Sequence, residues 1–217
     1  MGTITRSFAN NITTSGVLLP ASLTNNSIAN VTAYNASVAT GGMKLISSQT
    51  ASNSASISFT TGIDSTYKEY QFWFVDIHPR TNAVYFQFNL STDSGSNYNV
   101  TKTTTTFSAY HSETTGEALN YLGGRDLTQS TAFQDLTIGS LGSDADQSTS
   151  GTLTLFNPSS TTYVKHFISI LNETTEDDFS GNDFIAGYGN TTSAVNAIQF
   201  KMSSGNMDGT ILMYGIV

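Results

Sequence analysis

The chain contains three histidines, His78, His111 and His166, which are the first side chains to consider for metal binding or general-base catalysis. Either role needs partner residues at a defined spacing. The three positions form neither an HxH nor an HExxH pattern, and His78 stands in a His-Pro turn sequence. We therefore expect the histidines to have structural or surface roles, and we predict no metal site built on them.

Two acidic segments, GSDADQS and NETTEDDFSGND, are the next source of possible chemistry. Calcium takes six to eight oxygen ligands from carboxylates, amides and carbonyls, which such loops can supply. Neither segment matches the twelve-residue EF-hand pattern, so solvated surface loops are the favoured interpretation and calcium binding stays open. The acidic residues concerned are Asp144, Asp146, Glu173, Glu176, Asp177, Asp178 and Asp183.

Patterns for covalent catalysis are missing from the sequence. There is no cysteine and no G-x-S-x-G nucleophile motif. A glycosidase needs two carboxylates roughly 5–10 Å apart, a distance that a sequence does not reveal. We therefore predict that the chain is not an enzyme and that it needs no cofactor.

Six tyrosines offer a further kind of binding chemistry. Aromatic rings can stack on sugars, but in β-sandwiches they also fill sheet edges and subunit interfaces, where an apolar body with a polar tip is useful. Both interpretations remain open for Tyr34, Tyr85, Tyr98, Tyr110, Tyr163 and Tyr188.

The composition limits the classes of partner. Charged residues make up 11% of the 217 residues, against about 25% in typical domains. The net charge of −8 makes nucleic acids and anionic membranes unfavourable partners. No stretch approaches the roughly 20 apolar residues of a membrane-spanning helix. The opening MGTITRSFANN lacks the apolar core of a secretory signal, so we expect the chain to be made and used without Sec export.

The segment from Lys68 to Leu90 is the densest aromatic region of the chain and contains its one tryptophan. From Tyr70 to Ile77, apolar residues fall on both parities of a strand, which predicts a central strand buried on both faces. After a turn sequence around Pro79, the stretch from Val84 to Leu90 alternates apolar and mostly polar residues. The two runs suggest an antiparallel hairpin.

Many further short strands follow one another between turn sequences rich in Gly, Asn, Asp and Ser. Glu113–Leu122 is the best candidate for a short helix. This pattern predicts an all-β fold, an antiparallel two-layer β-sandwich of jelly-roll type over residues 41–217, preceded by an extended arm. The residues predicted for the core are Phe72, Trp73, Phe74, Phe86, Phe88, Phe200 and Tyr214.

Residues 1–40 form the predicted N-terminal arm. This segment is rich in Thr, Asn, Ser and Ala, and its apolar residues follow neither helical nor strand periodicity. We interpret it as an assembly arm whose scattered apolar side chains fill pockets on a neighbouring subunit. The arm residues proposed for this role are Phe8, Ile12, Leu18, Leu23, Ile28 and Val31.

Three stretches of the chain resemble virion structural proteins of tailed bacteriophages, notably phages of marine bacteria and cyanobacteria. They are GIDSTYKEYQFWFVDIHP, TTSAVNAIQFKMSSGNMDGTILMYGI and the opening MGTITRSFANNITTSG. The resemblance covers most of residues 41–217 and brings no catalytic residues with it. Such proteins are typically β-sandwich units that decorate capsids or serve as fibre and appendage modules, commonly as trimers.

The resemblance implies a surface protein of the virion that is assembled in the cytoplasm of the bacterial host and is held by contacts with other virion proteins. The sequence has no heptad run and no G-X-Y repeat to build a fibre shaft, which favours a capsid decoration protein. The alternative is a tail or neck appendage that binds a host-surface glycan. A homo-oligomer, preferably a trimer, is expected in either case.

Overall fold

The computed structural model describes residues 42–114 and 116–217, which contain twelve strands and one short 3₁₀ turn, η1. The strands are β1 (Met43–Ser54), β2 (Ile57–Phe59), β3 (Glu69–Pro79), β4 (Phe86–Ser91), β5 (Lys102–Ser112), β6 (Glu117–Tyr121), β7 (Gln134–Asp135), β8 (Thr149–Phe156), β9 (Lys165–Thr174), β10 (Phe179–Gly189), β11 (Ala197–Met202) and β12 (Met207–Ile216); η1 spans Gly123–Arg125. The all-β prediction is confirmed.

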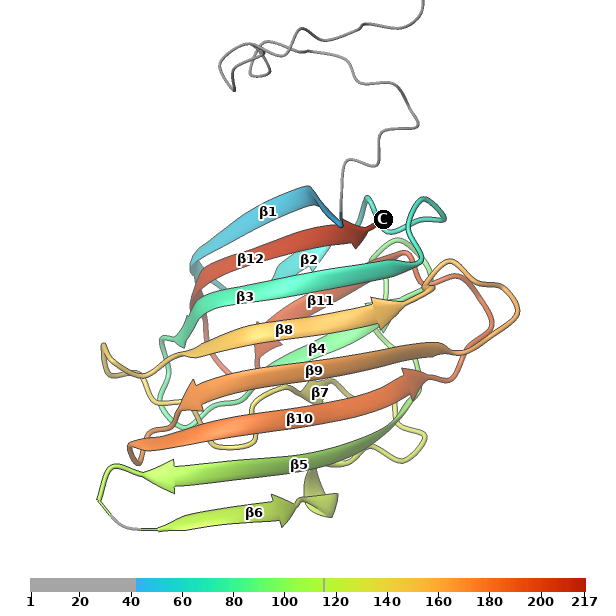
Figure 1. The fold of residues 1–217 in the computed structure, drawn as a ribbon. Helices are drawn as coiled ribbons and strands as arrows, with labels where there is room; N and C mark the ends of the chain where they lie inside the picture. The colour runs from blue at the N-terminus through green and yellow to red at the C-terminus, as the bar shows by residue number, and fades with distance from the viewer. Residues whose placement is uncertain (1–41, 115) are drawn as a thin grey trace, which may run out of the picture. The chain divides into compact units, whose positions relative to one another are not determined.

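The strands form two antiparallel sheets that pack face to face (Figure 1). The larger sheet has the order β1-β12-β3-β8-β9-β10-β5-β6, and the smaller has the order β2-β11-β4-β7. Numbering the eight strands β1, β2, β3, β4, β7, β8, β11 and β12 in chain order gives sheets 1-8-3-6 and 2-7-4-5. This is the connectivity of a jelly roll, as predicted from the sequence.

Two insertions enlarge this jelly roll. The strands β5 and β6 are inserted between β4 and β7, and the hairpin β9–β10 is inserted between β8 and β11. All four add to the same edge of the larger sheet, beyond β8. The larger sheet therefore extends well past the smaller one, and this extension needs another cover on its inner face.

The core lies between the two sheets and is dominated by phenylalanine. Phe72, Phe74, Phe86, Phe88 and Phe200 are all fully or almost fully buried, which confirms five of the predicted core residues. The ring of Phe200, on β11, lies 5.1 Å from that of Phe74 and 5.4 Å from that of Phe72, on β3. Such aromatic contacts between inner faces are what hold a sandwich together.

The other two predicted core residues, Trp73 and Tyr214, were assigned to the wrong face. Trp73 is 39% exposed, and half-buried Tyr214 packs against it with 5.3 Å between ring centroids. Both side chains lie on the outer face of the larger sheet. The prediction that β3 is buried on both faces is therefore wrong, because Trp73 and Val75 of its second apolar parity face outward. Ile77 of the same parity is buried, beyond the irregularity in register that follows Phe74.

The hairpin predicted within Lys68–Leu90 does not form. β3 pairs with β12 and β8, whereas β4 belongs to the smaller sheet and pairs with β11 and β7. The turn after Pro79 therefore carries the chain from one sheet to the other. The short helix predicted at Glu113–Leu122 is also wrong, since Glu117–Tyr121 forms the edge strand β6 against β5.

The chain divides into two units, residues 1–41 and 42–217, and the sandwich is the second. The predicted arm residues, Phe8, Ile12, Leu18, Leu23, Ile28 and Val31, lie outside the described residues, so their role remains a prediction. In the part of the chain that the structure describes, no helix is both long and apolar enough to cross a membrane.

Candidate functional site

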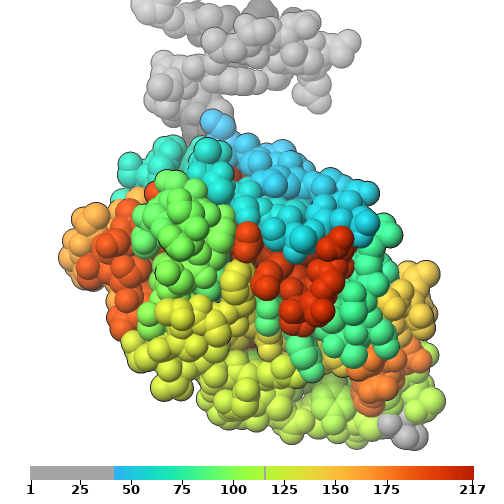
Figure 2. All heavy atoms as spheres, turned by 180° about the vertical axis from the view of Figure 1, so that it is seen from behind, coloured from blue at the N-terminus to red at the C-terminus, as the bar shows by residue number. Residues whose placement is uncertain are grey.

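The inner face of the sheet extension is covered by residues 122–142, the connection that runs through η1 and β7. Backbone hydrogen bonds tie this connection to the inserted strand β5, from Lys102 to Ser130 and from Thr104 to Leu127. Others tie it to the smaller sheet, where Leu136 N donates to Phe86 O. Figure 2, seen from the side opposite to Figure 1, shows this yellow to yellow-green segment beside the smaller sheet. The site is formed beneath it.

Two buried carboxyl groups, on Glu173 of β9 and Asp183 of β10, lie on this inner face. Glu173 is 2% exposed and Asp183 is fully buried. Alternation along each strand turns both side chains inward, on the same parity as Leu171 and Ile185. The register pairs Glu173 with Gly181, two residues before Asp183, so the two carboxyl groups come from adjacent strands.

The covering connection donates one backbone hydrogen bond to each carboxyl group. Gly139 N donates to Glu173 Oε1 over 2.6 Å, and Ile138 N donates to Asp183 Oδ2 over 3.0 Å. The second oxygens, Glu173 Oε2 and Asp183 Oδ1, are buried and accept no N–H; a side-chain hydrogen bond links the two carboxyl groups, and Asp183 has another with Ser108. A hydrogen bond between two carboxyl groups requires that one of them keeps its proton, because an ionised carboxylate only accepts.

Glycines on two sides make room for the Glu173 side chain. A Cβ at Gly181 would come within 2.9 Å of Glu173 Cγ, and a Cβ at Gly139 would come within 2.6 Å of its Oε1. Real Cβ atoms do not approach other heavy atoms this closely. The two glycines therefore form a cradle around the Glu173 side chain, and a residue with a Cβ would not fit at either position.

Burial raises the pKa of Glu173 to about 9, and the neighbouring charge of Asp183 adds to this effect. Burial also raises the pKa of Asp183 above its ordinary value. Arg125, whose charge acts on Asp183 in the opposite sense, is engaged at 3.0 Å with Asp135. Because two like charges in a dry site cannot both persist unpaired, the pair requires either a shared proton or a bound cation.

A surface cavity of about 330 Å³ opens directly onto Glu173. Its wall includes polar groups from Ser108, Asn120, Ser140, Thr175 and Asp177, and the aromatic rings of Tyr110 and Phe179, which lie 5.3 Å apart. Leu122 and Ile138 supply apolar wall. A cavity of this size holds a hydrated ion or one sugar ring, since a water molecule occupies about 30 Å³.

Two lysines that the sequence interpretation did not single out, Lys102 and Lys165, are buried at the start of β5 and β9. Lys102 Nζ donates to Asn89 Oδ1 and, over 2.9 Å, to Val100 O. Lys165 Nζ donates to Tyr163 O over 2.6 Å. Burial lowers the pKa of Lys102 to about 7. Both lysines share the parity of buried neighbours, which is a signal that the sequence did contain.

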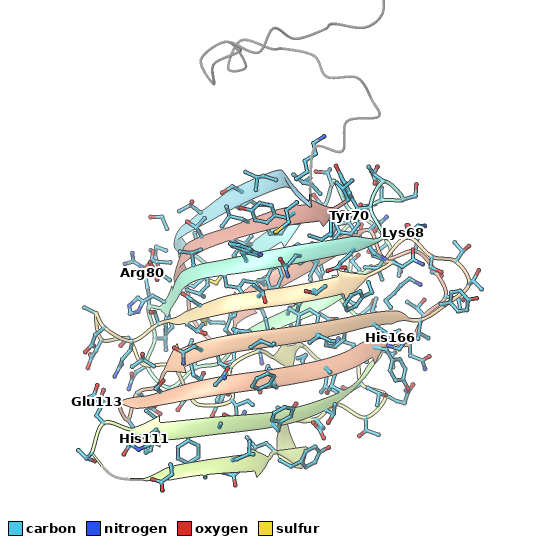
Figure 3. All side chains as sticks on the ribbon, viewed as in Figure 1. Lys68, Tyr70, Arg80, His111, Glu113 and His166 are labelled. Carbon is cyan, nitrogen blue, oxygen red and sulfur yellow. The ribbon has the colours of Figure 1, made fainter. Side chains whose placement is uncertain are left out.

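The histidines do not converge. His111 and His166 lie toward opposite ends of the strands of the larger sheet (Figure 3). The Nδ1 atoms of His78 and His111 each contact a backbone carbonyl oxygen, of Gln147 and Ser112 respectively, over 2.6 Å. Among the described residues, no group of three or more His, Asp or Glu side chains is arranged to hold a metal ion.

The acidic segments separate into surface and buried parts. Asp144, Asp146, Asp177 and Asp178 are exposed, as expected for solvated loops. Glu176 fixes local structure instead, accepting hydrogen bonds from Ser140 Oγ and Asn82 Nδ2. For Glu173 and Asp183, however, the prediction of a solvated loop is wrong. Both residues belong to strands, β9 and β10, and lie at inward-facing positions.

The six tyrosines are dispersed. Tyr110 lines the cavity, Tyr163 is 69% exposed, and the guanidinium of Arg125 lies 3.9 Å from the Tyr85 ring centroid. Tyr98 and Tyr188 are half-buried, and Tyr34 lies outside the described residues. The structure therefore brings no two of the described members together into a stacking platform.

An apolar row crosses the outer face of the larger sheet. Successive register pairs connect one residue on each of seven neighbouring strands, and we call this set the outer row: Leu212, Trp73, Thr152, Ile170, Phe184, Phe107 and Tyr121. Its exposed members include Trp73, Ile170 and Phe107, at 39%, 43% and 41%, and Tyr121, at 66%. Exposed Ile168 and Val75 flank the row.

Comparison with known proteins does not add a relative: no protein-family model, no curated protein and no solved structure matches the chain.

Proposed function

We propose that this protein is a structural subunit of the virion surface of a tailed bacteriophage, held in place by protein–protein contacts, with a capsid decoration protein as the preferred role. The observation that carries the proposal is the outer row. Together with the phage-like sequence stretches, it supports an assembly function over catalysis.

The outer row has the dimensions of an interface. Seven strands at about 4.8 Å spacing give a length of about 29 Å, comparable to the side of a standard interface burying about 800 Å² per partner. The row contains no charged residue. A second copy of the chain can therefore dock against it without burying an unpaired charge, and depletion of charge is typical of interface centres.

The outer row should consequently mediate self-association of the chain within the particle. Ile170→Asp places a charge at the middle of the row, and we expect it to shift the oligomer to monomer in light scattering coupled to gel filtration. Ser96→Asp, at an exposed loop position near the smaller sheet, adds the same charge and should leave the oligomer intact. An Ile170→Asp protein that is folded and still oligomeric would contradict this role.

The location in the particle is tested by counting copies. Hundreds of copies per purified particle are expected for a capsid decoration protein. Multiples of three or six up to a few dozen would instead indicate a tail or neck position, and absence from particles would refute the proposal.

The alternative, a tail or neck appendage that binds host glycan, is favoured by one observation. The cavity combines the rings of Tyr110 and Phe179 with the amide of Asn120, groups that suit the apolar face and hydroxyls of a sugar. Saturable binding on a glycan array, lost in Tyr110→Ala, would promote this alternative.

A further inference from the structure

We propose that strand β6 is a docking edge for a second copy of the chain, which pairs through its own β6 in antiparallel register about Leu119. This contact rests on the proposed function, because a particle surface is a place where many copies lie close together. It differs from contact through the outer row, since it joins two sheets edge to edge through their backbones.

The strand β6 lies at one end of the larger sheet, and among the described residues β5 is the one strand that pairs with it. Leu122 N donates to Thr106 O over 3.0 Å, which makes these two residues a hydrogen-bonded pair. In an antiparallel ladder such pairs alternate with pairs whose backbone groups point away from each other. The N–H and C=O groups of Glu117, Leu119 and Tyr121 therefore point away from β5, toward the open side of the sheet.

The same positions of β6 carry exposed apolar side chains. Leu119 is 71% exposed and Tyr121 is 66% exposed, which places them among the most exposed large apolar side chains of the sandwich. Tyr121 is also the last member of the outer row, so the apolar surface of the larger sheet continues to this edge. Backbone groups that can pair and apolar side chains that can be covered thus coincide on β6.

The other sheet edges have features that prevent pairing. The strand β1, at the opposite end of the larger sheet, carries exposed Lys44 and two irregularities of register, between Leu45 and Ser47 and between Ala51 and Ser54. The strands β2 and β7, at the ends of the smaller sheet, are three and two residues long. Lysine, bulges and very short strands protect natural sheet edges. In contrast, β6 pairs regularly over five residues and contains neither Lys nor Pro.

The register about Leu119 suits a second copy as the occupant. It places Leu119 opposite Leu119 of the second copy, and Glu117 opposite Tyr121 of the second copy. All three outward-pointing residues then form hydrogen-bonded pairs. Glu117 is the one charged residue of β6, and it faces a phenol instead of another carboxylate, so no like charges lie directly opposite. Such self-complementarity is what a two-fold interface requires.

The size of the edge limits where the contact forms. A specific, stable interface buries about 1,200–2,000 Å² in total. Five residues at about 3.4 Å each give an edge about 17 Å long, which is too small to reach this area alone. The contact therefore forms between copies that are already held close together, where the effective concentration is high. For this reason Ile170→Asp should still give monomers in dilute solution.

Cysteine cross-linking of the purified full chain in concentrated solution tests the contact, because the chain contains no cysteine of its own. Leu119→Cys should form a disulfide-linked dimer under mild oxidation, visible on a non-reducing gel. Hydrogen-bonded partners in an antiparallel pair have Cα atoms about 5.5 Å apart, within the range that disulfides span.

Glu117→Cys is the matched control on the same strand and the same face. Two residues 117 would lie about 14 Å apart across the two-fold axis, so this variant alone should stay monomeric on the gel. A mixture of Glu117→Cys and Tyr121→Cys should form a mixed dimer, because the register places these two positions opposite each other.

The results separate this contact from the virion role. Equal cross-linking of Leu119→Cys and Glu117→Cys would indicate random collision and would overturn the proposed register. Absence of a Leu119→Cys dimer would overturn the edge contact, whether or not the chain is found in particles. A Leu119→Cys dimer together with the mixed dimer would support the edge contact even if particles lack the chain, and that absence would refute the virion role alone.

Discussion

At the scale of single residues, the fold separates side chains of the same type by the face on which they lie. Phe200 and Trp73 are both large aromatics in central strands, yet Phe200 is fully buried and Trp73 is 39% exposed. Phe200 has five ring neighbours between 5.1 and 6.4 Å. Trp73 packs against Tyr214 with the two rings tilted by 52° and donates from Nε1 to Gln71 Oε1 over 2.7 Å.

This difference predicts unequal costs of truncation. Phe200→Ala should lower the free energy of unfolding by about 3–5 kcal/mol, because it removes a ring from the packed interior. Trp73→Ala should lower it by about 1 kcal/mol, since much of the ring is already hydrated. Urea titration of the two variants measures both values. Equal losses would mean that the outer face is covered in the isolated protein.

At the scale of strands, the sequence predicted the class of the fold better than its pairings. Alternation identified the buried parity of β4 and β11, because one residue in two meets the opposite sheet. In β3, apolar residues on both parities concealed which face is buried. The pairing of β3 with β12 and β8 was not predictable, since partners more than 70 residues apart leave no local signal. Inference of a hairpin from Lys68–Leu90 failed for this reason.

The sequence likewise indicated the acidic residues of the candidate site, but not their burial. Glu173 and Asp183 stood out within an acidic segment, and that composition favoured a solvated loop. Their burial follows from strand parity, which pairs Glu173 with Leu171 and Asp183 with Ile185 on the inward side. The covering connection, which comes from residues 122–142, could not be anticipated, because it depends on the tertiary arrangement.

The register between β12 and β3 is fixed by an irregularity at Gly209, where the pairing shifts between Asp208 and Thr210. Gly209 has φ +119°, and a Cβ there would lie 2.5 Å from Asp76 O and 2.9 Å from Ile77 Cα. We expect Gly209→Ala to lower the free energy of unfolding by about 1–3 kcal/mol, the usual cost of such a backbone conformation.

A matched control for this substitution is Gly124→Ala, at a position where a Cβ meets nothing within 4 Å. It should change stability by less than about 0.5 kcal/mol. Chemical denaturation of both variants would decide the point. A neutral Gly209→Ala would show that β12 and β3 can pair without this irregularity.

At the scale of the whole molecule, the sandwich carries its own core. Residues contributing to one continuous hydrophobic cluster run from Ala51 to Met213 and come from both sheets. A cluster of this extent can support an independently stable domain of residues 42–217. The division of the chain at residues 41 and 42 marks where such a domain begins.

Deletion of residues 2–40 therefore tests the arm separately from the sandwich. We expect the truncated protein to unfold at nearly the same temperature as the full chain, because the cluster from Ala51 to Met213 is retained. We also expect it to lose oligomerisation or incorporation into particles. Ordering an arm costs about 1–2 kcal/mol per residue, which contacts with a neighbouring subunit, including strand addition, would have to offset.

Calorimetry and light scattering on the two proteins give the two readouts, and Ile170→Asp in the full chain provides the comparison. Loss of assembly in both would mean that arm and outer row act together in holding neighbours. A truncated protein that unfolds would show that the arm belongs to the sandwich core. A truncated protein that assembles normally would place the interface on the outer row alone. The arm and the outer row are the two contacts proposed to hold copies together in solution, and only the outer row remains after the deletion.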